Sequence, residues 1–350
     1  MIAATEGLRV IPTIAIANPL DYAAEIKDLF VAHGMPSFPD YFDRTYPAAV
    51  RSGAMSWLGR DESGRVVMHQ ACFPRRFRSA QRDVVACLMV NLMVATEYRA
   101  VFPALTLLKR VVQDLEARGG VDFLYADPNR PAWMLLQACR FARMGTLQRY
   151  VLPVSDRHVV LDGCIRLFHT WLRVTNGAGA GAGAGMAAVA HAAQEFPLGS
   201  VAAPRLTPPT VAAYHDAALY ASRLAGYPST LDWWLTLHAP DGPAGPPATA
   251  LLIRGPEASG RASVRAWRRA PEVDPAAPVP GLIAQLRRRG CTRLQVSTIA
   301  ESAFARALRR AGFIPRADTV PILAKALTPA GAACVAAVDA WEITDLECDR

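Results

Sequence analysis

The chain has 350 residues, of which 52% are hydrophobic and 19% are charged, and 38 Lys and Arg residues against 30 Asp and Glu residues give a formal net charge of +8. This composition excludes disordered and low-complexity proteins, collagen-like proteins and small disulfide-stapled domains. The length exceeds that of one average domain, so two domains with cores of their own are expected.

The positive charge is distributed unevenly along the chain. The surplus is +4 in residues 1–154, +1 in 155–205 and +7 in 206–330, whereas 331–350 carries −4. A positive body suits an anionic ligand, a nucleic acid or a membrane surface. Because 35 of the 38 basic residues are Arg, a general compositional bias explains the surplus equally well.

The first third of the chain predicts a strand, a helix, a hairpin and a long buried strand. Apolar residues recur with a helical period in one segment, and alternate or run continuously in the others. The turn Asp61-Glu62-Ser63-Gly64 separates the two hairpin strands. The predicted ranges are 10–17 for the first strand, 20–33 for the helix, 54–60 and 65–72 for the hairpin, and 83–95 for the buried central strand.

The stretch that follows alternates helices with strands. An amphipathic helix is predicted over 104–115, and Gly119-Gly120 supplies its stop signal. A short strand at 121–126 leads into Asp127-Pro128-Asn129, a turn that caps a second helix running to about Cys139. The last strand of this half is expected at 146–154.

The middle of the chain contains a linker pattern. Residues 159–174 predict a helix with a broad apolar face, and alternating Gly and Ala over 177–185 predict a flexible linker. Later segments repeat the earlier order of elements. We predict a helix around Leu282–Leu286, a strand at 293–297, a helix capped by Glu301-Ser302 and a strand at 319–324.

Two stretches of this order align as an internal repeat. Gly120–Phe141 and Gly290–Phe313 each span a helix end, a strand, a turn, a helix and an aromatic residue, and a strand follows each. The repeat predicts a duplicated α/β domain with a mixed sheet.

One order of elements in the first half begins with Val94-Ala95-Thr96-Glu97-Tyr98-Arg99 and continues with a helix, with Pro128-Asn129 and with a helix ending at Phe141. This order resembles the GNAT superfamily of acyl-CoA-dependent N-acyltransferases. The resemblance covers 54–154 and, more weakly, 282–326, and Leu231–His238 resembles the start of a second copy. It implies two GNAT-like folds in tandem. The implied divisions are an N-terminal domain at 1–154, a helix and linker at 155–205, a C-terminal domain at 206–330 and an acidic tail at 331–350.

The resemblance implies an acetyl-CoA or other acyl-CoA donor, and an amine of a small molecule or sugar precursor as acceptor. In the family, a loop with the pattern Arg/Gln-x-x-Gly-x-Gly/Ala presents backbone N–H groups to the CoA pyrophosphate. Here Arg99 and Ala104 match, whereas Phe102 stands where glycine is expected. The implied cofactor-binding residues are Met93, Val94, Arg99, Ala100, Val101, Phe102, Ala104 and Asn129. The proline-rich stretch before Gly281 offers no such loop in the second half, so the first half is expected to bind CoA.

The catalytic residues are left open by the sequence. The family's proton-donating Tyr corresponds to Leu136 and, in the second copy, to Leu308, neither of which can donate a proton. Asn91, Tyr125 and Asp127 are candidate polar groups near the predicted strand ends, and His69 is a possible base. A helix cap and a packing ring explain Asp127 and Tyr125 equally well, whereas a satisfied buried amide and a structural histidine are the favoured explanations of Asn91 and His69.

Two other functions remain open. One is a GNAT-like scaffold that binds a ligand or partner without catalysis, and the other is a Fem-like transferase that uses aminoacyl-tRNA. No nucleic-acid-binding motif accompanies the basic clusters at 75–78 and 287–289. Cys and His residues lack CxxC, HxxH and HxxxH spacings, so no metal site is predicted. Unpaired cysteines and the lack of a membrane-spanning run predict a cytoplasmic protein.

Overall fold

The structure, a computed structural model, describes residues 12–79, 82–99, 101–155, 186–192, 211–213, 231–238, 247–269, 273–274 and 276–344. The predicted helix at 159–174 and the Gly-Ala run at 177–185 lie outside these residues.

The first half of the chain contains a helical hairpin, an antiparallel meander and two strand–helix units. Its strands are β1 (Thr13–Ala17), β2 (Met55–Arg60), β3 (Val66–Arg78), β4 (Asp83–Val94), β5 (Phe123–Ala126) and β6 (Ala142–Pro153). Its α-helices are α1 (Ala23–Ala32), α2 (Phe38–Arg51), α3 (Val101–Arg118) and α4 (Arg130–Ala138), with 3-10 turns η1 (Pro19–Tyr22) and η2 (Thr96–Tyr98).

The second half repeats the strand–helix units. Its strands are β7 (Ala187–Ala192), β8 (Val211–Ala213), β9 (Asp232–His238), β10 (Thr249–Arg254), β11 (Arg261–Arg269), β12 (Arg293–Ile299), β13 (Ile314–Ala326) and β14 (Trp341–Glu342). Its helices are α7 (Val279–Arg288), α8 (Ala303–Arg310) and α9 (Pro329–Ala336), with the 3-10 turn η3 (Val338–Ala340).

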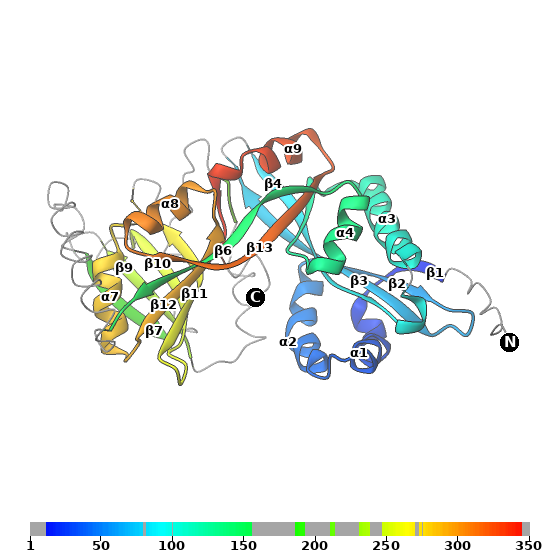
Figure 1. Ribbon diagram of the computed structural model, residues 1–350, viewed down its shortest axis with the longest axis horizontal. Coiled ribbons are helices and arrows are strands. Elements are labelled where there is room, and N and C mark those ends of the chain that lie inside the picture. Colours follow the sequence, from blue (N-terminus) through cyan, green and yellow to red (C-terminus); the bar gives the residue numbers. More distant parts are fainter. Residues whose placement is uncertain are drawn as a thin grey trace.

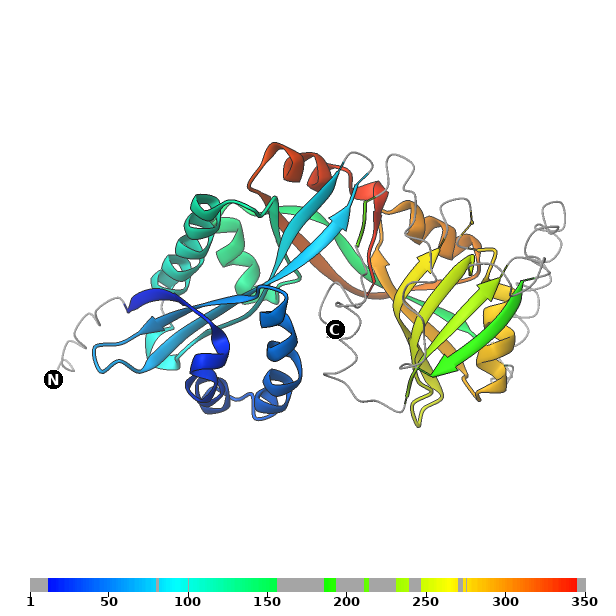
Figure 2. The ribbon, with the colours of Figure 1, turned by 180° about the vertical axis from the view of Figure 1, so that it is seen from behind.

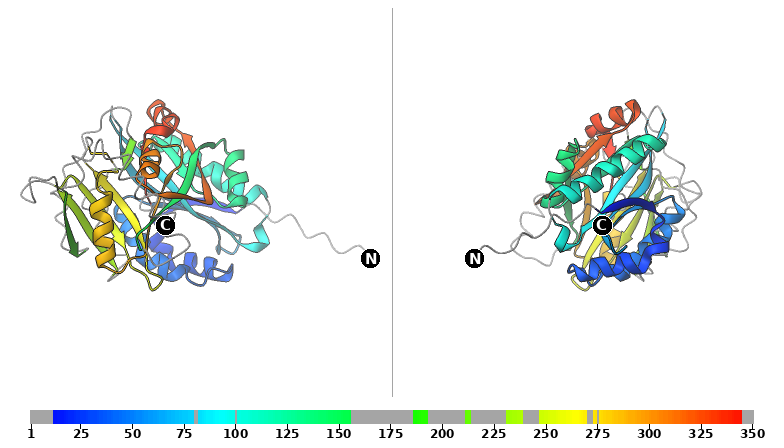
Figure 3. Two further views of the ribbon diagram at one scale, coloured as in Figure 1. Left: turned by 60° about the vertical axis from the view of Figure 1, so that its left-hand side comes forward. Right: turned by 90° about the vertical axis from the view of Figure 1, so that its right-hand side faces the viewer.

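One mixed sheet passes through both halves, in the order β1-β2-β3-β4-β5-β13-β6-β12-β11-β10-β9-β7. Figure 1 shows two lobes side by side along the long axis, with β6 and β13 running between them. In the first lobe, α1 and α2 cover one face of the sheet, and α3 and α4 cover the other (Figure 3, right). This layering buries a core on each side of the strands.

The closing strands of the two halves are exchanged. Strand β6 follows α4 of the first half but pairs antiparallel with β12 of the second, from Pro153↔Arg293 to Leu147↔Ile299. Strand β13 follows α8 of the second half but pairs with β5 of the first, from Ala126↔Leu323 to Phe123↔Ala326. The two exchanged strands also pair with each other, and Figure 2 shows them crossing between the lobes from behind. Each lobe therefore contains a strand from the other half of the chain.

The locally encoded elements follow the sequence predictions. Helix α3 ends at Arg118, and Gly119 and Gly120 both have positive φ angles, of 67° and 78°. The side chains of Asn129 and Ser302 cap α4 and α8, accepting hydrogen bonds from the backbone N–H of Ala132 and Ala305. The repeated unit predicted from the sequence is present in both halves.

Other segments differ from the predictions. The helix predicted over 20–33 begins with a 3-10 turn, and Leu20 is exposed because it lies in that turn. Strand β3 extends six residues past its predicted end at Cys72, with Arg75 and Phe77 buried in it. Helix α2 was not predicted. Within the expected linker range, β7 pairs with β9 at the edge of the second-half sheet.

Candidate active site at the diverging strands

Strands β4 and β5 pair only along the first part of β4. Their parallel register runs from Ala86↔Phe123 to Leu88↔Tyr125, and β5 ends at Ala126. Strand β4 continues to Val94, so no described strand pairs with its β5-side edge over residues 89–94. We call this segment the open edge of β4. It presents backbone amide groups to whatever lies between the strands.

A β-bulge interrupts the open edge at Asn91. The register with β3 passes from Ala71↔Val90 to His69↔Met93, so two β4 residues face the single β3 residue Gln70. Asn91 has a φ of 58°, a left-handed conformation that Asn adopts more readily than most residues. The Gln70 side chain donates a hydrogen bond to the Val90 carbonyl at 2.8 Å. The bulge is thus held by a side chain of the neighbouring strand.

His69 is the second side chain that holds the bulge. Its Nδ1 lies 2.8 Å from the carbonyl oxygen of Asn91, and its Nε2 lies 3.1 Å from the Ser56 hydroxyl. A carbonyl only accepts, so Nδ1 carries the proton and the Ser56 hydroxyl donates to Nε2. Full burial lowers the pKa of His69 to about 4. His69 is therefore neutral, and both its nitrogens are engaged, which argues against a role as the base.

The amide of Asn91 is satisfied from helix α2. Its Nδ2 donates to the Tyr46 hydroxyl at 2.9 Å and lies 3.5 Å from the Tyr41 hydroxyl. Tyr46 is fully buried, whereas Tyr41 is partly exposed. The Asn91 side chain thus has the structural role of a satisfied amide, and the partly exposed Tyr41 lies beside it.

Sequence analysis missed both tyrosines because it missed helix α2. The signal was present as an aromatic stripe at four-residue spacing, Phe38, Phe42 and Tyr46, with a proline in the first turn. Phe30 stacks on Phe38 at 3.6 Å between ring centroids, and Phe42 stacks on Tyr46 at 4.0 Å. This packing fixes α2 over the bulge.

The expected phosphate loop connects β4 to α3. Met93 and Val94 are the buried last residues of β4, Ala100 lies outside the described residues, and Val101 begins α3. The exposed Arg99 turns back, and its Nε donates to the Val94 carbonyl at 3.0 Å.

The first turn of α3 carries the residues that depart from the family pattern. Phe102 is 74% exposed, whereas Ala104 is buried against the core. Pro103 has no N–H to offer, although a proline fits the first turn of a helix. This loop therefore offers fewer backbone donors than a glycine loop would.

The remaining predicted residues lie at the end of β5. Tyr125 is buried, and its ring packs edge-on to Phe77 at 5.9 Å, as a core side chain does. Asp127 is half-buried in the turn that follows, and Asn129 caps α4. Leu136 is buried on α4. The structure thus brings Tyr125 and Asp127 to the carboxyl edge of the sheet where the strands diverge.

The second half has a corresponding divergence, between β11 and β12, but the chain itself fills it. These strands pair only from Arg261↔Arg293 to Ser263↔Gln295. Beyond this, the Thr344 hydroxyl donates to the Arg265 carbonyl at 2.8 Å, and Glu342 forms an ion pair with Arg269. Ile343 and Thr344 are buried. Among the described residues, only the first half keeps an open strand edge at its divergence.

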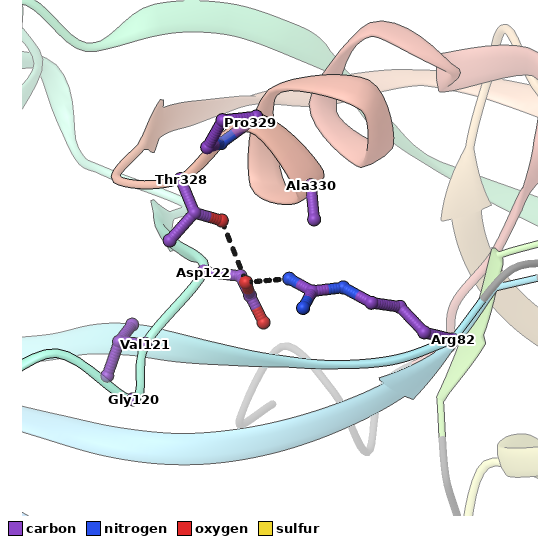
Figure 4. Close-up of a pocket in the computed structure, with 7 residues that line it drawn as sticks. All are labelled: Arg82, Gly120, Val121, Asp122, Thr328, Pro329 and Ala330. Carbon is purple, nitrogen blue, oxygen red and sulfur yellow. Dashed lines mark hydrogen bonds and ion pairs between the residues drawn. The ribbon is translucent and has the colours of Figure 1, made fainter.

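A pocket of about 580 Å³ lies at the opposite edge of the first-half sheet (Figure 4). Asp122 forms an ion pair with Arg82, accepts from the Thr328 hydroxyl at 2.7 Å and accepts from the Val85 N–H at 2.9 Å. These groups satisfy one another and join the end of β13 to the start of β5. We interpret this pocket as a structural junction.

Cysteine and metal chemistry find no support among the described residues. Cys72 and Cys87 are buried, and burial raises the pKa of the Cys87 thiol to about 12. No group of three His, Cys, Asp or Glu side chains in the described ranges could hold a metal ion. Within the same ranges, no helix combines the length and apolar character needed to cross a bilayer.

Comparisons with known proteins connect this geometry to a fold. No protein-family model matches the chain, and no curated protein sequence matches it. Solved structures do match. A conserved protein from Enterococcus faecalis V583, described as a probable N-acyltransferase, has a TM-score of 0.63 at 9% identity over 91% of this chain and 73% of its own.

Two further structures extend the likeness. A GCN5-related N-acetyltransferase from Anabaena variabilis ATCC 29413 has a TM-score of 0.62 at 11% identity, over 91% of this chain and 74% of its own. A tandem GNAT protein from the clavulanic acid biosynthesis pathway has a TM-score of 0.51 at 13% identity, over 91% of this chain and 99% of its own. The chain therefore has a tandem GNAT fold, which confirms the predicted fold class.

Proposed function

We propose that this protein is an acyl-CoA-dependent N-acyltransferase, with its donor site at the open edge of β4 in the first half. The observation that carries the proposal is the strand edge at residues 89–94, with which no described strand pairs; it contains the Asn91 bulge and leads into α3. Backbone N–H and C=O groups on such an edge can pair with the amides of a pantetheine arm in the way that a neighbouring strand would.

The reaction that fits this site is attack of an amine nitrogen on the thioester carbonyl carbon. A C–N bond forms, the C–S bond breaks, the amine loses a proton to a base, and the leaving thiolate takes up a proton. Asp127 is the carboxylate at the carboxyl end of β5, and we assign it the role of base, acting directly or through a water molecule. The amine would approach from the α2 face, where Asn91 and the tyrosines lie.

The proton donor for the leaving thiolate needs a different source from the family's tyrosine. Leu136 occupies that position and is aliphatic. Tyr41 provides a hydroxyl 3.5 Å from Asn91 Nδ2 at the bulge, and its ring is partly exposed. We assign the proton donor to Tyr41.

Binding and turnover test the proposal separately. Acetyl-CoA should stabilise the protein against thermal unfolding and should yield free CoA thiol when an amine acceptor is added. A matched pair of variants is Asp127→Asn, which should retain donor binding and lose turnover, and Asp83→Asn at the far end of β4, which should retain both. If no acyl thioester binds, neither acyl-CoA nor acyl-pantetheine, the donor assignment is wrong.

A non-catalytic scaffold is the second candidate. The observations that favour it are the aliphatic, buried Leu136 and Leu308 at the two tyrosine positions and the exposed Phe102 in the loop. This candidate predicts that acyl-CoA binds without release of thiol in the presence of any amine. Acceptor-dependent thiol release rejects it.

A further inference from the structure

Two large apolar side chains are exposed on the helices that follow the diverging strands. Phe102 on α3 is 74% exposed and Met134 on α4 is 68% exposed, the highest values among the large hydrophobic residues that the structure describes. Helices α3 and α4 follow the parallel strands β4 and β5, so both begin at the carboxyl edge of the sheet. Figure 1 shows the two helices side by side.

The loop between β4 and α3 suits only part of a CoA molecule. A pyrophosphate needs several backbone N–H groups at close range. Phe102 replaces the glycine of the family pattern, Pro103 contributes no N–H, and the Nε of Arg99 is directed to the Val94 carbonyl. Along the open edge of β4, in contrast, no described strand takes the place that an extended arm would occupy. The site thus favours the pantetheine part of a donor over its nucleotide part.

Near these two residues in sequence lie two arginines that have no carboxylate partner among the described residues: Arg99 precedes Phe102 by three residues, and Arg130 precedes Met134 by four on α4. Arg99 and Arg130 are exposed, and no described Asp or Glu side chain lies within 4.0 Å of either guanidinium. Elsewhere in the first half, Arg65 is paired with Glu97, and Arg110 with Asp114. Apolar anchors bordered by unpaired cations complement an acidic, amphipathic protein surface.

From this juxtaposition we propose that the donor reaches the site on an acidic carrier protein, which bears the acyl group as a thioester on a phosphopantetheine arm. The inference rests on the proposed acyl transfer and changes only the source of the thioester. The bonds are the same: a C–N bond forms to the amine, the C–S bond breaks, and the arm leaves as a free thiol that has gained a proton. Phe102, Met134 and Arg130 form the docking surface, and the arm lies along the open edge of β4.

The test compares three acetyl thioesters: acetyl-pantetheine, acetyl-CoA and an acidic bacterial acyl carrier protein loaded with an acetyl-phosphopantetheine arm. We expect the loaded carrier to bind at least about tenfold more tightly than acetyl-CoA at low salt, with the difference shrinking as salt rises. Met134→Ser and Arg130→Glu should each weaken carrier binding on the order of tenfold. Both should leave acetyl-pantetheine binding within about twofold.

Matched controls separate docking from general damage. Val31→Ser changes another exposed apolar residue on a different helix, and Arg110→Gln changes a cation already paired with Asp114. Both should bind the carrier as the unmodified protein does. Equal affinity for acetyl-CoA and the loaded carrier, or equal losses in the controls, would overturn the carrier inference alone. Failure of all three thioesters to bind would overturn the proposed function and this inference with it.

Discussion

The imidazole of His69 donates from Nδ1 to the carbonyl oxygen of Asn91 at 2.8 Å, so a buried histidine on β3 fixes the bulge of β4. The Asn91 side chain is fixed in turn by Tyr46 of α2, at 2.9 Å. Side chains from two other elements, β3 and α2, therefore determine the shape of the strand edge on which the proposed donor lies. His69 and Asn91 are residue types that often serve in catalysis, but here they hold the bulge and so determine the geometry of the open edge.

The stability of the fold should fall on acidification because of His69. Its folded pKa, about 4, lies below the ordinary value of 6.5, so the unfolded chain binds a proton between these pH values while the folded protein does not. The free energy of unfolding should therefore be unaffected by this group above pH 6.5. It should drop by about 3 kcal/mol as the pH falls to 4. Urea unfolding at pH 7 and pH 4 measures the drop.

His69→Gln provides the comparison for that experiment. This variant has no group that titrates at position 69, so its loss of stability between the two pH values should be clearly smaller. His33→Gln serves as the control for replacing a histidine by glutamine at a partly exposed position. A histidine at position 69 that titrates near 6.5 in NMR spectra would contradict the argument.

Asn91→Ala should lower the free energy of unfolding by about 2–3 kcal/mol. About half of this loss in stability arises because alanine tolerates the left-handed φ of 58° less well than asparagine does. The other half arises because the hydrogen bond to Tyr46 is lost. Asn91→Gly can adopt the left-handed conformation without strain, so this variant should lose only the stability that the hydrogen bond to Tyr46 contributes. Denaturant titration distinguishes them, and equal losses in the two variants would show that the backbone conformation is not under strain.

Tyr41→Phe should reduce acyl transfer on the order of 10–100-fold, since the variant lacks the proposed proton donor. Donor affinity should stay within about twofold because the ring itself is retained. Steady-state turnover, together with calorimetric binding of the acyl donor, separates the two effects. Tyr46→Phe is the counterpart: its hydroxyl is buried and accepts from Asn91, so this change should mainly lower stability. Undiminished turnover in Tyr41→Phe would remove Tyr41 from the mechanism.

Gly331→Ala should destabilise the fold by about 3 kcal/mol. An added Cβ would come within 1.9 Å of the Asp122 carbonyl oxygen, a backbone atom that cannot move aside cheaply. That oxygen also accepts from the N–H groups of Leu327 and Thr328, which anchor the exchanged strand β13. The midpoint of thermal unfolding reports the effect, and Ala333→Ser, at an exposed position of the same helix, should change it little.

The candidate site was predictable in part. The strand at 83–95, the helix after it and the Asn129 cap are encoded by short-range periodicity and by side chains that bond to nearby backbone, and the structure confirms them. The partners of Asn91 were not predictable, because His69 and Tyr46 lie 22 and 45 residues before it. Helix α2 was missed although its aromatic spacing was present.

The sequence by itself determined the local units: two copies of a strand, a turn, a capped helix and an aromatic residue, and from these the fold class. The sequence patterns that predict these units extend over only a few residues, so they can be recognised without knowing which distant segment each unit contacts. Only the tertiary structure decided that β6 and β13 change places, that residues 342–344 fill one divergence, and that no described strand pairs with β4 at the other. Strand pairing is decided by which buried faces and backbone edges meet in space, and an antiparallel partner can come from anywhere in the chain.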